Sequence, residues 1–513
     1  MIIYQVLTRL FGNDKAQCHP YGTKAQNGCG KMSDFTHKAL EEIRSLGATH
    51  IWYTGIIEHA TQTDYRAYGI SLDNPDVVKG RAGSAYAIKD YYDVDPDLAD
   101  KVPLRMKEFH NLVKRSHEAE LKVIIDFVPN HVARQYHSDA CPEGTQDLGV
   151  SDDTTQSFSN QNNFYYLPGE VLHLDNIKPD SSYLEEPAKA TGNDIFSAWP
   201  GQNDWYETVK LNYGVDYCSG RVGCFTPVPD TWNKMLHILL FWAQKGIDGF
   251  RCDMAEMVPV EFWEWVIPQV KEAFPSIVFI AEVYNPAEYR KYIHRGHFDY
   301  LYDKVGLYDT LKAVAQGNAS SQSITSCWQQ TDDIRPHMLN FLENHDEQRI
   351  ASDFFVADAR KGRAPLLVSA LMGNNPFMLY FGEEIGEAAA DTKDHRTSIF
   401  NKITVPSLQR LYAYIHTRQG LEQKELETLN RFRRLMAEAP DWGETYDLVY
   451  CNMDTPGFKV DSHYIWMRIS ERGTFLLGAN FTKEKADISV FIPGYTSRIN
   501  ISIPPMGGNI LKL

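Results

Sequence analysis

Eight short apolar segments, separated by helical patterns, constrain the fold of this chain more than any other feature. They are Ile2–Leu7, His50–Ile56, Lys122–Val128, Asp248–Cys252, Ile277–Ala281, Asp299–Tyr302, Met338–Leu342 and Phe377–Phe381. The third segment is almost continuously apolar, which is typical of a strand buried on both faces of a parallel sheet. Eight β/α units predict a closed (β/α)8 barrel, the TIM-barrel fold, rather than an open doubly wound sheet. No segment is followed by the GxGxxG turn of a dinucleotide-binding sheet.

Apolar residues at helical spacing predict helices between these segments. The first helix is expected to begin at a cap formed by Ser33-Asp34 and to end at Gly47. A second is expected to open at Pro103, and two more span about residues 230–244 and 259–274.

Two stretches depart from the β/α alternation. About 95 residues, from His131 to Phe225, are rich in Asn, Asp, Ser, Gly and Tyr, and are too long for a plain βα loop. From about Gly443 onward, short alternating runs bounded by Gly and Pro predict a small antiparallel β domain. We therefore expect a barrel from residues 1–131 and 226–442, an inserted subdomain from 132–225 and a C-terminal domain from 443–513.

Charge and composition exclude some classes of partner. The formal net charge is −16 and the sequence has no basic tract, which argues against nucleic-acid binding. No run approaches about 18 apolar residues, so no membrane span is expected. The first ten residues, MIIYQVLTRL, predict a strand rather than a signal peptide. We expect a cytoplasmic protein, or a periplasmic or secreted one if a leader precedes residue 1.

The 8 cysteines lack a CxxC motif and are expected to be free thiols, with Cys252 buried.

Ionisable clusters follow four of the predicted strands. They are DFVPNH at 126–131, GFRCD at 249–253, FIAE at 279–282 and FLENHD at 341–346. In a barrel, the loops after the strands converge on one cleft, so these clusters should meet there. A single Asp after a strand is more often a turn former or helix cap, and a lone Arg is usually an ion-pair partner. Together, three carboxylates with nearby cations suit acid/base and nucleophilic chemistry. The residues concerned are Asp253, Glu282, Asp346, Arg251, His131 and His345.

In this order and spacing, the four clusters resemble the motifs of the α-amylase superfamily, glycoside hydrolase family 13. Further similar segments are YQVLTRLF at the first strand, GATHIWYTGI at the second, SAYAIKDYYDVDP before the third and NPFMLYFGEEIG at the eighth. The resemblance covers most of residues 1–400, and the tail is similar to the β-sandwich domain of that family. It implies that the long insertion and the tail are the family's two accessory domains.

The resemblance also implies catalytic roles. Asp253 corresponds to the nucleophile, Glu282 to the general acid/base and Asp346 to the third carboxylate, which stabilises a distorted sugar. In retaining glycosidases the first two carboxyl groups lie about 5–5.5 Å apart. Arg251 lies two residues before Asp253 and so should point to the same side of the strand, where it would keep Asp253 anionic.

The substrate-binding residues implied by the resemblance surround the same cleft. His131 and His345 would donate hydrogen bonds to sugar hydroxyls. Tyr86 matches the tyrosine that packs on the apolar face of a glucose ring, although a core tyrosine is the alternative.

The resemblance leaves calcium open. Many relatives hold this ion with the Asn of the first motif, which is Asn130 here, and with an Asp of the inserted subdomain, for which Asp175 is the candidate. Asn130 could equally brace the loop by hydrogen bonding. Calcium needs six to eight oxygen ligands. A DxNxDGxxD loop is not found near the first strand.

The segment TVKLN at 208–212 is similar to its counterpart in neopullulanase-like enzymes, which suggests tolerance of α-1,6 bonds or short oligosaccharides.

These residues predict a retaining glycoside hydrolase that cleaves α-1,4-glucosidic bonds of starch, maltodextrins or malto-oligosaccharides through a covalent glycosyl-enzyme. One alternative is a transglycosylase, isomerase, or neopullulanase- or α-glucosidase-like enzyme of the same superfamily, because these need the same three carboxylates. Another is a non-catalytic glucan-binding barrel, although such proteins usually lose the carboxylates. The expected partner is a neutral α-glucan, for which net charge matters little and the 28 tyrosines offer faces for stacking.

Overall fold

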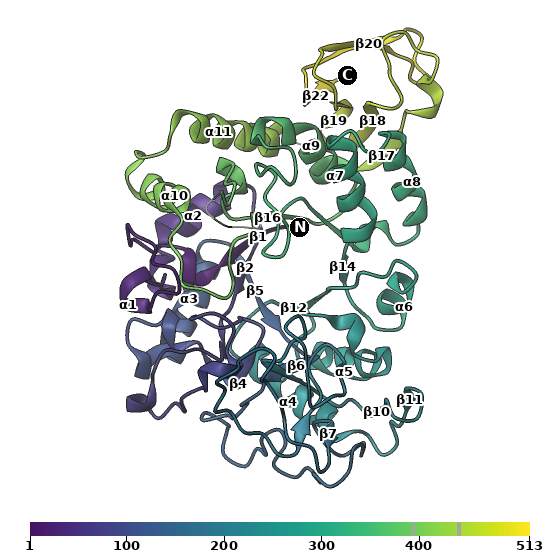
Figure 1. The fold of residues 1–513 in the computed structure, drawn as a ribbon. Helices are drawn as coiled ribbons and strands as arrows, with labels where there is room; N and C mark the ends of the chain where they lie inside the picture. Colours follow the sequence, from purple (N-terminus) through teal and green to yellow (C-terminus); the bar gives the residue numbers. More distant parts are fainter. Residues whose placement is uncertain (391, 393–394, 439–442) are drawn as a thin grey trace.

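A closed barrel of parallel strands forms the centre of the molecule (Figure 1). The computed structural model describes residues 1–390, 392, 395–438 and 443–513. The barrel strands, each next to its sequence neighbour, are β1 (Ile2–Leu7), β2 (His50–Thr54), β5 (Lys122–Phe127), β12 (Gly249–Cys252), β13 (Val278–Ala281), β14 (Tyr300–Tyr302), β15 (Met338–Phe341) and β16 (Phe377–Tyr380). Strand β1 pairs with both β2 and β16, which closes the barrel. The prediction of a (β/α)8 barrel is confirmed.

Helices, the longer of which bury one apolar face, surround the barrel. They are α1 (Lys24–Asn27), α2 (His37–Ser45), α3 (Arg105–Glu118), α4 (Asp230–Ala243), α5 (Val260–Ala273), α6 (Tyr289–His294), α7 (Asp309–Ala315), α8 (Gln322–Gln330), α9 (Arg363–Leu371), α10 (Pro406–Thr417) and α11 (Gln423–Glu438). In α5, for example, Val260, Trp263, Ile267 and Val270 are buried at helical spacing.

The helix predicted to begin at Ser33-Asp34 is α2, and it begins two residues later than predicted. Residues Met32–Asp34 form a separate 3-10 turn, and the cap of α2 is Thr36, whose hydroxyl accepts a hydrogen bond from the Ala39 N–H at 3.2 Å. Ser, Asp and Thr are all favourable capping residues, so the sequence allowed a helix start at Ser33-Asp34 as well as at Thr36.

A hairpin between β2 and α3 was not predicted as strands. It consists of β3 (Ile57–His59) and β4 (Ile88–Val94), which pair in antiparallel fashion with irregular register. The segment between β5 and α4 contains only short strands: β6 (His131–Ala133), β7 (Tyr166–Leu167), β8 (Ala188–Lys189), β9 (Thr208–Lys210), β10 (Val215–Asp216) and β11 (Val222–Gly223). Strand β6 pairs with β9, which fastens this segment to the end of β5.

The C-terminal strands are antiparallel, as predicted, and lie at the opposite end of the molecule from β7, β10 and β11 (Figure 1). Four of them, β17 (Glu444–Asp447), β18 (His463–Ser470), β19 (Gly473–Asn480) and β22 (Gly507–Lys512), form one sheet, and β20 (Ala486–Val490) pairs with β21 (Ile499–Ile503). The Trp466 indole donates a hydrogen bond to the Leu371 carbonyl of α9, which docks this sheet on the barrel. The predicted boundary between 442 and 443 falls at residues 439–442, outside the described residues.

Two further sequence expectations concern helices and cysteines. Among the described residues, no helix combines the length and apolar character that crossing a bilayer requires. All 8 cysteines are free thiols, and Cys252 is fully buried.

Candidate active site

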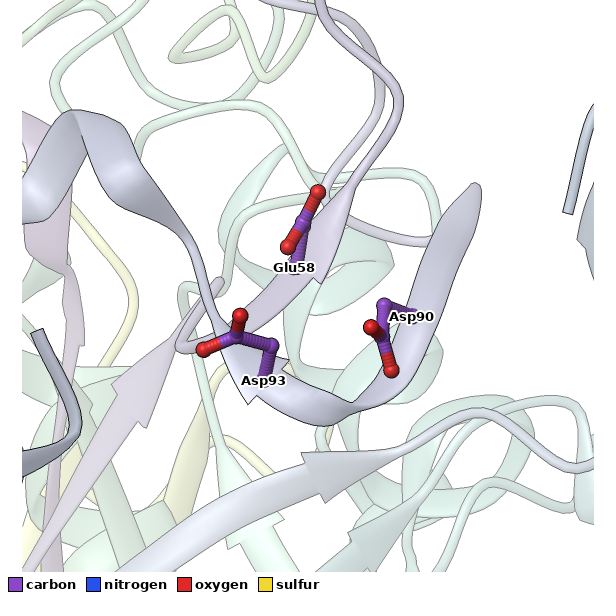
Figure 2. A group of neighbouring side chains, drawn as sticks. All are labelled: Glu58, Asp90 and Asp93. Carbon is purple, nitrogen blue, oxygen red and sulfur yellow. The ribbon is translucent and has the colours of Figure 1, made fainter. Parts of the chain in front are cut away.

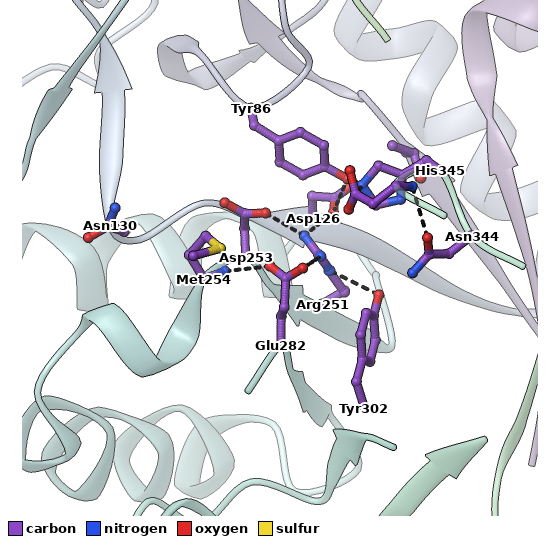
Figure 3. Close-up of polar contacts among 12 residues, drawn as sticks. Tyr86, Asp126, Asn130, Arg251, Asp253, Met254, Glu282, Tyr302, Asn344 and His345 are labelled. Atoms are coloured by element: carbon purple, nitrogen blue, oxygen red, sulfur yellow. Dashed lines mark hydrogen bonds and ion pairs between the residues drawn. The ribbon is translucent and has the colours of Figure 1, made fainter. Parts of the chain in front are cut away.

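Arg251 connects the carboxylates at the carboxyl ends of neighbouring strands (Figure 3). Its side chain is 0% exposed. Its Nη1 lies 2.7 Å from Asp253 Oδ1 and 3.6 Å from Asp126 Oδ1, and its Nη2 lies 3.0 Å from Glu282 Oε1. Its Nε donates to the Tyr302 hydroxyl at 3.1 Å. One guanidinium therefore holds three buried carboxylates in a fixed arrangement.

The strand register explains why these side chains meet. Arg251 in β12 is paired with Asp126 in β5, and Cys252 is paired with Ala281 in β13. Asp253 and Glu282 are the first residues after their strands, and the Glu282 N–H donates to the Cys252 carbonyl at 3.1 Å. The sequence prediction that these two carboxylates share the carboxyl end of the barrel is thus met by the geometry.

Glu282 is 3% exposed and accepts two further hydrogen bonds. The Tyr284 hydroxyl donates to its Oε1 at 2.5 Å, and the backbone N–H of Met254 donates to its Oε2 at 2.8 Å. Met254 has a left-handed φ of 45°, a strained conformation for a residue with a side chain. This turn directs the N–H of Met254 toward Glu282.

Asp346 belongs to a second arm of the site, built on the loop after β15. His345 Nε2 lies 3.0 Å from Asp346 Oδ2 and 2.6 Å from the Tyr86 hydroxyl, and its Nδ1 lies 2.8 Å from Gln5 Nε2. Burial acts to raise the pKa of Asp346, but His345 and the more distant Arg251 outweigh it and lower this pKa to about 2. Asp346 is therefore ionised, and at 41% side-chain exposure it can reach a ligand.

Tyr86 packs against His345, with ring centroids 5.1 Å apart and an interplanar angle of 22°. Its hydroxyl also donates to Asp126 Oδ1 at 3.3 Å. Tyr86 is thus fixed by two polar contacts and lies among the catalytic candidates, as Figure 3 shows.

The charge balance of the carboxyl pair favours one retained proton. Burial raises the pKa of Asp253, Arg251 opposes this rise, and the neighbouring Glu282 adds to it. Two buried carboxylates beside a single guanidinium cannot both ionise without a cost in free energy.

His131 lies at the start of β6 and is 3% exposed. The edge of the Trp205 ring packs against it, with centroids 5.2 Å apart. Burial, and then the charge of Lys210, lower the pKa of His131 to about 3. The imidazole is therefore neutral and carries a single N–H.

The residues around Asn130 do not fit a calcium ion. The Lys210 ammonium is 2.6 Å from Asn130 Oδ1 and 2.6 Å from Asp194 Oδ1, in a buried position that a divalent cation would have to share. Two positive charges cannot occupy one cluster of oxygen ligands. Asp175, the other residue expected to bind calcium, is 64% exposed, and its Oδ2 lies 3.5 Å from His173 Nδ1. Asn130 instead braces the loop, because its Nδ2 donates to the Gly192 carbonyl at 2.7 Å.

A separate group of buried carboxylates lies on the β3–β4 hairpin (Figure 2). Glu58, Asp90 and Asp93 bring one oxygen each to within 4.8 Å of one another, a spacing that could hold one metal ion. Asp93, however, is paired with Arg105, and Asp90 accepts hydrogen bonds from Ser138 and from two backbone N–H groups. Burial, and then Asp90 and Asp93, raise the pKa of Glu58 to about 9. A proton on Glu58 would reduce the negative charge of this group.

Sequence reasoning missed several residues of the site. Asp126 was visible as a charge inside an apolar strand, yet was not assigned to the site. Tyr302 ends the sixth strand and Tyr284 follows the fifth strand's glutamate by two residues, so period-two alternation could have placed them. Lys210 gave no signal, because its role depends on the pairing of β9 with β6.

Comparisons with known proteins agree with this geometry. The family model described as "Alpha amylase, catalytic domain" matches residues 5–431. An α-amylase of Streptomyces lividans is 26% identical over 420 residues, which cover 74% of this chain and 42% of that protein, so the chain spans less than half of its length. A cyclomaltodextrinase of Geobacillus thermopakistaniensis is 23% identical over 462 residues, which cover 86% of this chain and 68% of that protein.

Solved structures show the same fold. The crystal structure of an α-amylase from Geobacillus thermoleovorans complexed with acarbose matches with a TM-score of 0.66 and 17% identity, and the match covers 99% of this chain and 97% of that one. The family model spans most of the chain, and the sequence motifs that carry the resemblance meet at one end of the barrel. The chain belongs to the α-amylase family, glycoside hydrolase family 13.

Proposed function

We propose that the protein is a retaining α-glucan hydrolase, in which Asp253 is the nucleophile and Glu282 the general acid/base. The observation that supports this most strongly is the bridge through Arg251, which fixes one buried carboxylate on each of its two terminal nitrogens, at 2.7 and 3.0 Å. A retaining glycosidase needs such a pair, with one group ionised and the other protonated.

In the first half-reaction, Asp253 attacks the anomeric carbon while Glu282 gives its proton to the departing glycosidic oxygen. The bond between sugar and leaving group breaks as the glycosyl ester on Asp253 forms. In the second half-reaction, Glu282 takes a proton from water, the water oxygen attacks the anomeric carbon, and Asp253 leaves as a carboxylate. Glu282 ends with its proton restored, so the cycle balances.

The structure supports this division of charge. Arg251 makes its shortest carboxylate contact with Asp253, at 2.7 Å, which favours the anion there. The proposed mechanism places a proton on Glu282, where the leaving group requires it. As positive charge develops on the sugar ring, the anionic Asp253 and Asp346 stabilise it.

The surrounding side chains are suited to hold a glucose unit. His131 and His345 each carry an N–H group, and Tyr86 offers an aromatic ring packed against His345. All three are buried, with exposures of 3%, 3% and 8%, so their hydrogen bonds to a sugar would form in a site largely closed to water.

The substrate class we propose is a starch-type α-glucan, with α-1,4 bonds as the main target. The family membership and the names of the relatives, α-amylase and cyclomaltodextrinase, support a malto-oligosaccharide substrate. A neutral glucan is compatible with the net charge of −16. The segment 208–212 favours some tolerance of α-1,6 bonds.

The test is a product profile on soluble starch, pullulan and maltotriose, with Asp253→Asn and Glu282→Gln in parallel. Each variant should lower turnover by about 10³-fold or more while leaving the fold intact. Glu288→Gln, which removes a surface carboxylate paired with Lys291, is the matched control and should keep normal activity. Near-normal activity of Asp253→Asn would contradict the proposal. Oligosaccharides longer than maltotriose would instead identify a transglycosylase.

A further inference from the structure

Trp199 and His173 form an exposed aromatic platform on the inserted segment. The two rings are stacked, with centroids 3.8 Å apart and an interplanar angle of 8°. Trp199 is 53% exposed, so one face of its indole is covered by the imidazole and a large part of the remainder meets solvent. Neither residue contacts the catalytic candidates, and the mechanism above does not use them.

The platform is held in place by the residues on either side of its rings. Leu172, Leu174 and Ala198 are buried in a small apolar cluster beneath the surface, with exposures of 4%, 3% and 1%. The His173 N–H donates to the Ala198 carbonyl at 2.8 Å, which joins the two chain segments. The neighbours of the two rings are thus anchored inward while the rings face outward, so little conformational entropy is lost when a ligand binds.

A carboxylate lies at the edge of the platform. Asp175 Oδ2 is 3.5 Å from His173 Nδ1, and the Asp175 side chain is 64% exposed. An exposed carboxylate beside a flat aromatic face can accept hydrogen bonds from hydroxyl groups while the ring packs against C–H groups. A pyranose ring presents this combination: an apolar face rimmed by hydroxyls.

The platform is connected to the catalytic cleft by a short, braced segment. Trp205, whose ring edge packs on His131, is only six residues beyond Trp199, so their Cα atoms are at most about 21 Å apart. The turn between them is fixed by Asp204, which accepts hydrogen bonds from the Gly201 N–H at 2.6 Å and from the Asn193 side chain at 3.3 Å. An extended glucan in the cleft could therefore approach the platform.

We propose that Trp199, His173 and Asp175 form a second α-glucan-binding site, outside the catalytic cleft, in which a glucose ring stacks on the exposed face of Trp199. The choice of α-glucan as ligand rests on the proposed function. A site of this kind raises affinity for long chains by avidity without changing the chemistry of short ones.

The experiment measures binding and catalysis separately. Binding to soluble starch is followed by affinity gel electrophoresis in the Asp253→Asn background, where turnover is expected to be about 10³-fold lower. Trp199→Ala should weaken starch binding about fivefold or more, a loss of the size expected for one aromatic stack. Asp175→Asn, which keeps the rings, should weaken it less. Leu184→Ala removes an exposed apolar side chain of the same segment, 72% exposed, and should leave binding unchanged.

Activity on maltotriose, measured in the Asp253-containing protein, separates this proposal from the proposed function. Trp199→Ala should change kcat/KM on maltotriose less than twofold, since the short substrate does not need the platform. If Trp199→Ala leaves starch binding unchanged while the protein hydrolyses maltotriose, the second binding site is refuted and the proposed function stands. If the wild-type protein is inactive on every α-glucan but binds starch in a manner that depends on Trp199, the proposed function is refuted and the second binding site is supported.

Discussion

Replacing Lys210 by methionine tests whether its buried ammonium, rather than a metal ion, stabilises the loops beside the active site. Lys210 is 3% exposed, and its ammonium lies 2.6 Å from both Asp194 Oδ1 and Asn130 Oδ1. Methionine keeps most of the apolar stem but removes the charge. Asp194 would then lose its closest cation, and Asn130 would lose a hydrogen-bond donor.

The expected cost follows from the burial of the pair. Removing one partner of a buried ion pair destabilises a protein by about 3–5 kcal/mol, because the other charge is left uncompensated. Asp194 is 19% exposed and has Arg221 at 3.9 Å, so the lower end applies. We expect Lys210→Met to lower the free energy of unfolding by about 3 kcal/mol.

The assay is urea unfolding at pH 7, with and without a chelator. Lys459→Met, which removes an exposed pair with Glu484, is the control and should cost less than about 1 kcal/mol. The double variant Lys210→Met/Asp194→Asn should recover part of the loss, because the orphaned charge is gone. A chelator should leave the wild-type midpoint unchanged. A loss below about 1 kcal/mol in Lys210→Met, or a wild-type midpoint lowered by chelator, would refute the reasoning.

Three further predictions concern the carboxylates. Arg251→Met should abolish most activity and lower the free energy of unfolding by about 3 kcal/mol or more. Arg251→Lys should retain only part of the activity and stability, since one ammonium cannot replace two terminal nitrogens. The measurements are kcat/KM and the urea midpoint of unfolding. Tyr284→Phe removes the hydrogen bond to Glu282 Oε1 and should lower kcat/KM about fivefold, the size of one typical hydrogen bond. An unchanged kcat/KM would contradict this. Glu58→Gln should be more stable than wild type at pH 8 but similar at pH 4, judged by urea midpoints. The folded protein holds the Glu58 proton up to a pKa of about 9, whereas the unfolded chain releases it near 4.5, so wild-type stability is lost as pH rises between these values. A wild type more stable than Glu58→Gln at pH 8 would be inconsistent with a proton there.

The barrel could be predicted because its strands carry a local signal. Each is a short apolar run bounded by turn residues, and the order of the strands around the barrel follows their order in the sequence. The hairpin β3–β4 was missed for the opposite reason. Its residues include Glu58, Asp90 and Asp93, charges that no local pattern marks as buried.

Asp253 and Glu282 could be predicted as candidates because each follows an apolar strand directly, whereas Asp346 lies in the loop after β15. The motifs that contain Asp253, Glu282 and Asp346 also placed the chain in its family. What the sequence could not supply was the partner of each charge. Lys210 is 80 residues from Asn130, and their contact depends on how the inserted segment folds back on β5. The calcium expectation rested on Asn130 and Asp175, and no sequence signal indicated that an ammonium lies beside Asn130.

The most direct test of the central claim is the mass of the peptide that contains Asp253 after Glu282→Gln reacts with maltotriosyl fluoride. Fluoride leaves without a proton, so the first half-reaction proceeds in this variant, while water is no longer activated for the second. The account predicts a maltotriosyl ester on Asp253, absent when Asp253→Asn is combined with Glu282→Gln. An unmodified Asp253 alongside released fluoride, or an adduct on another residue, would contradict it.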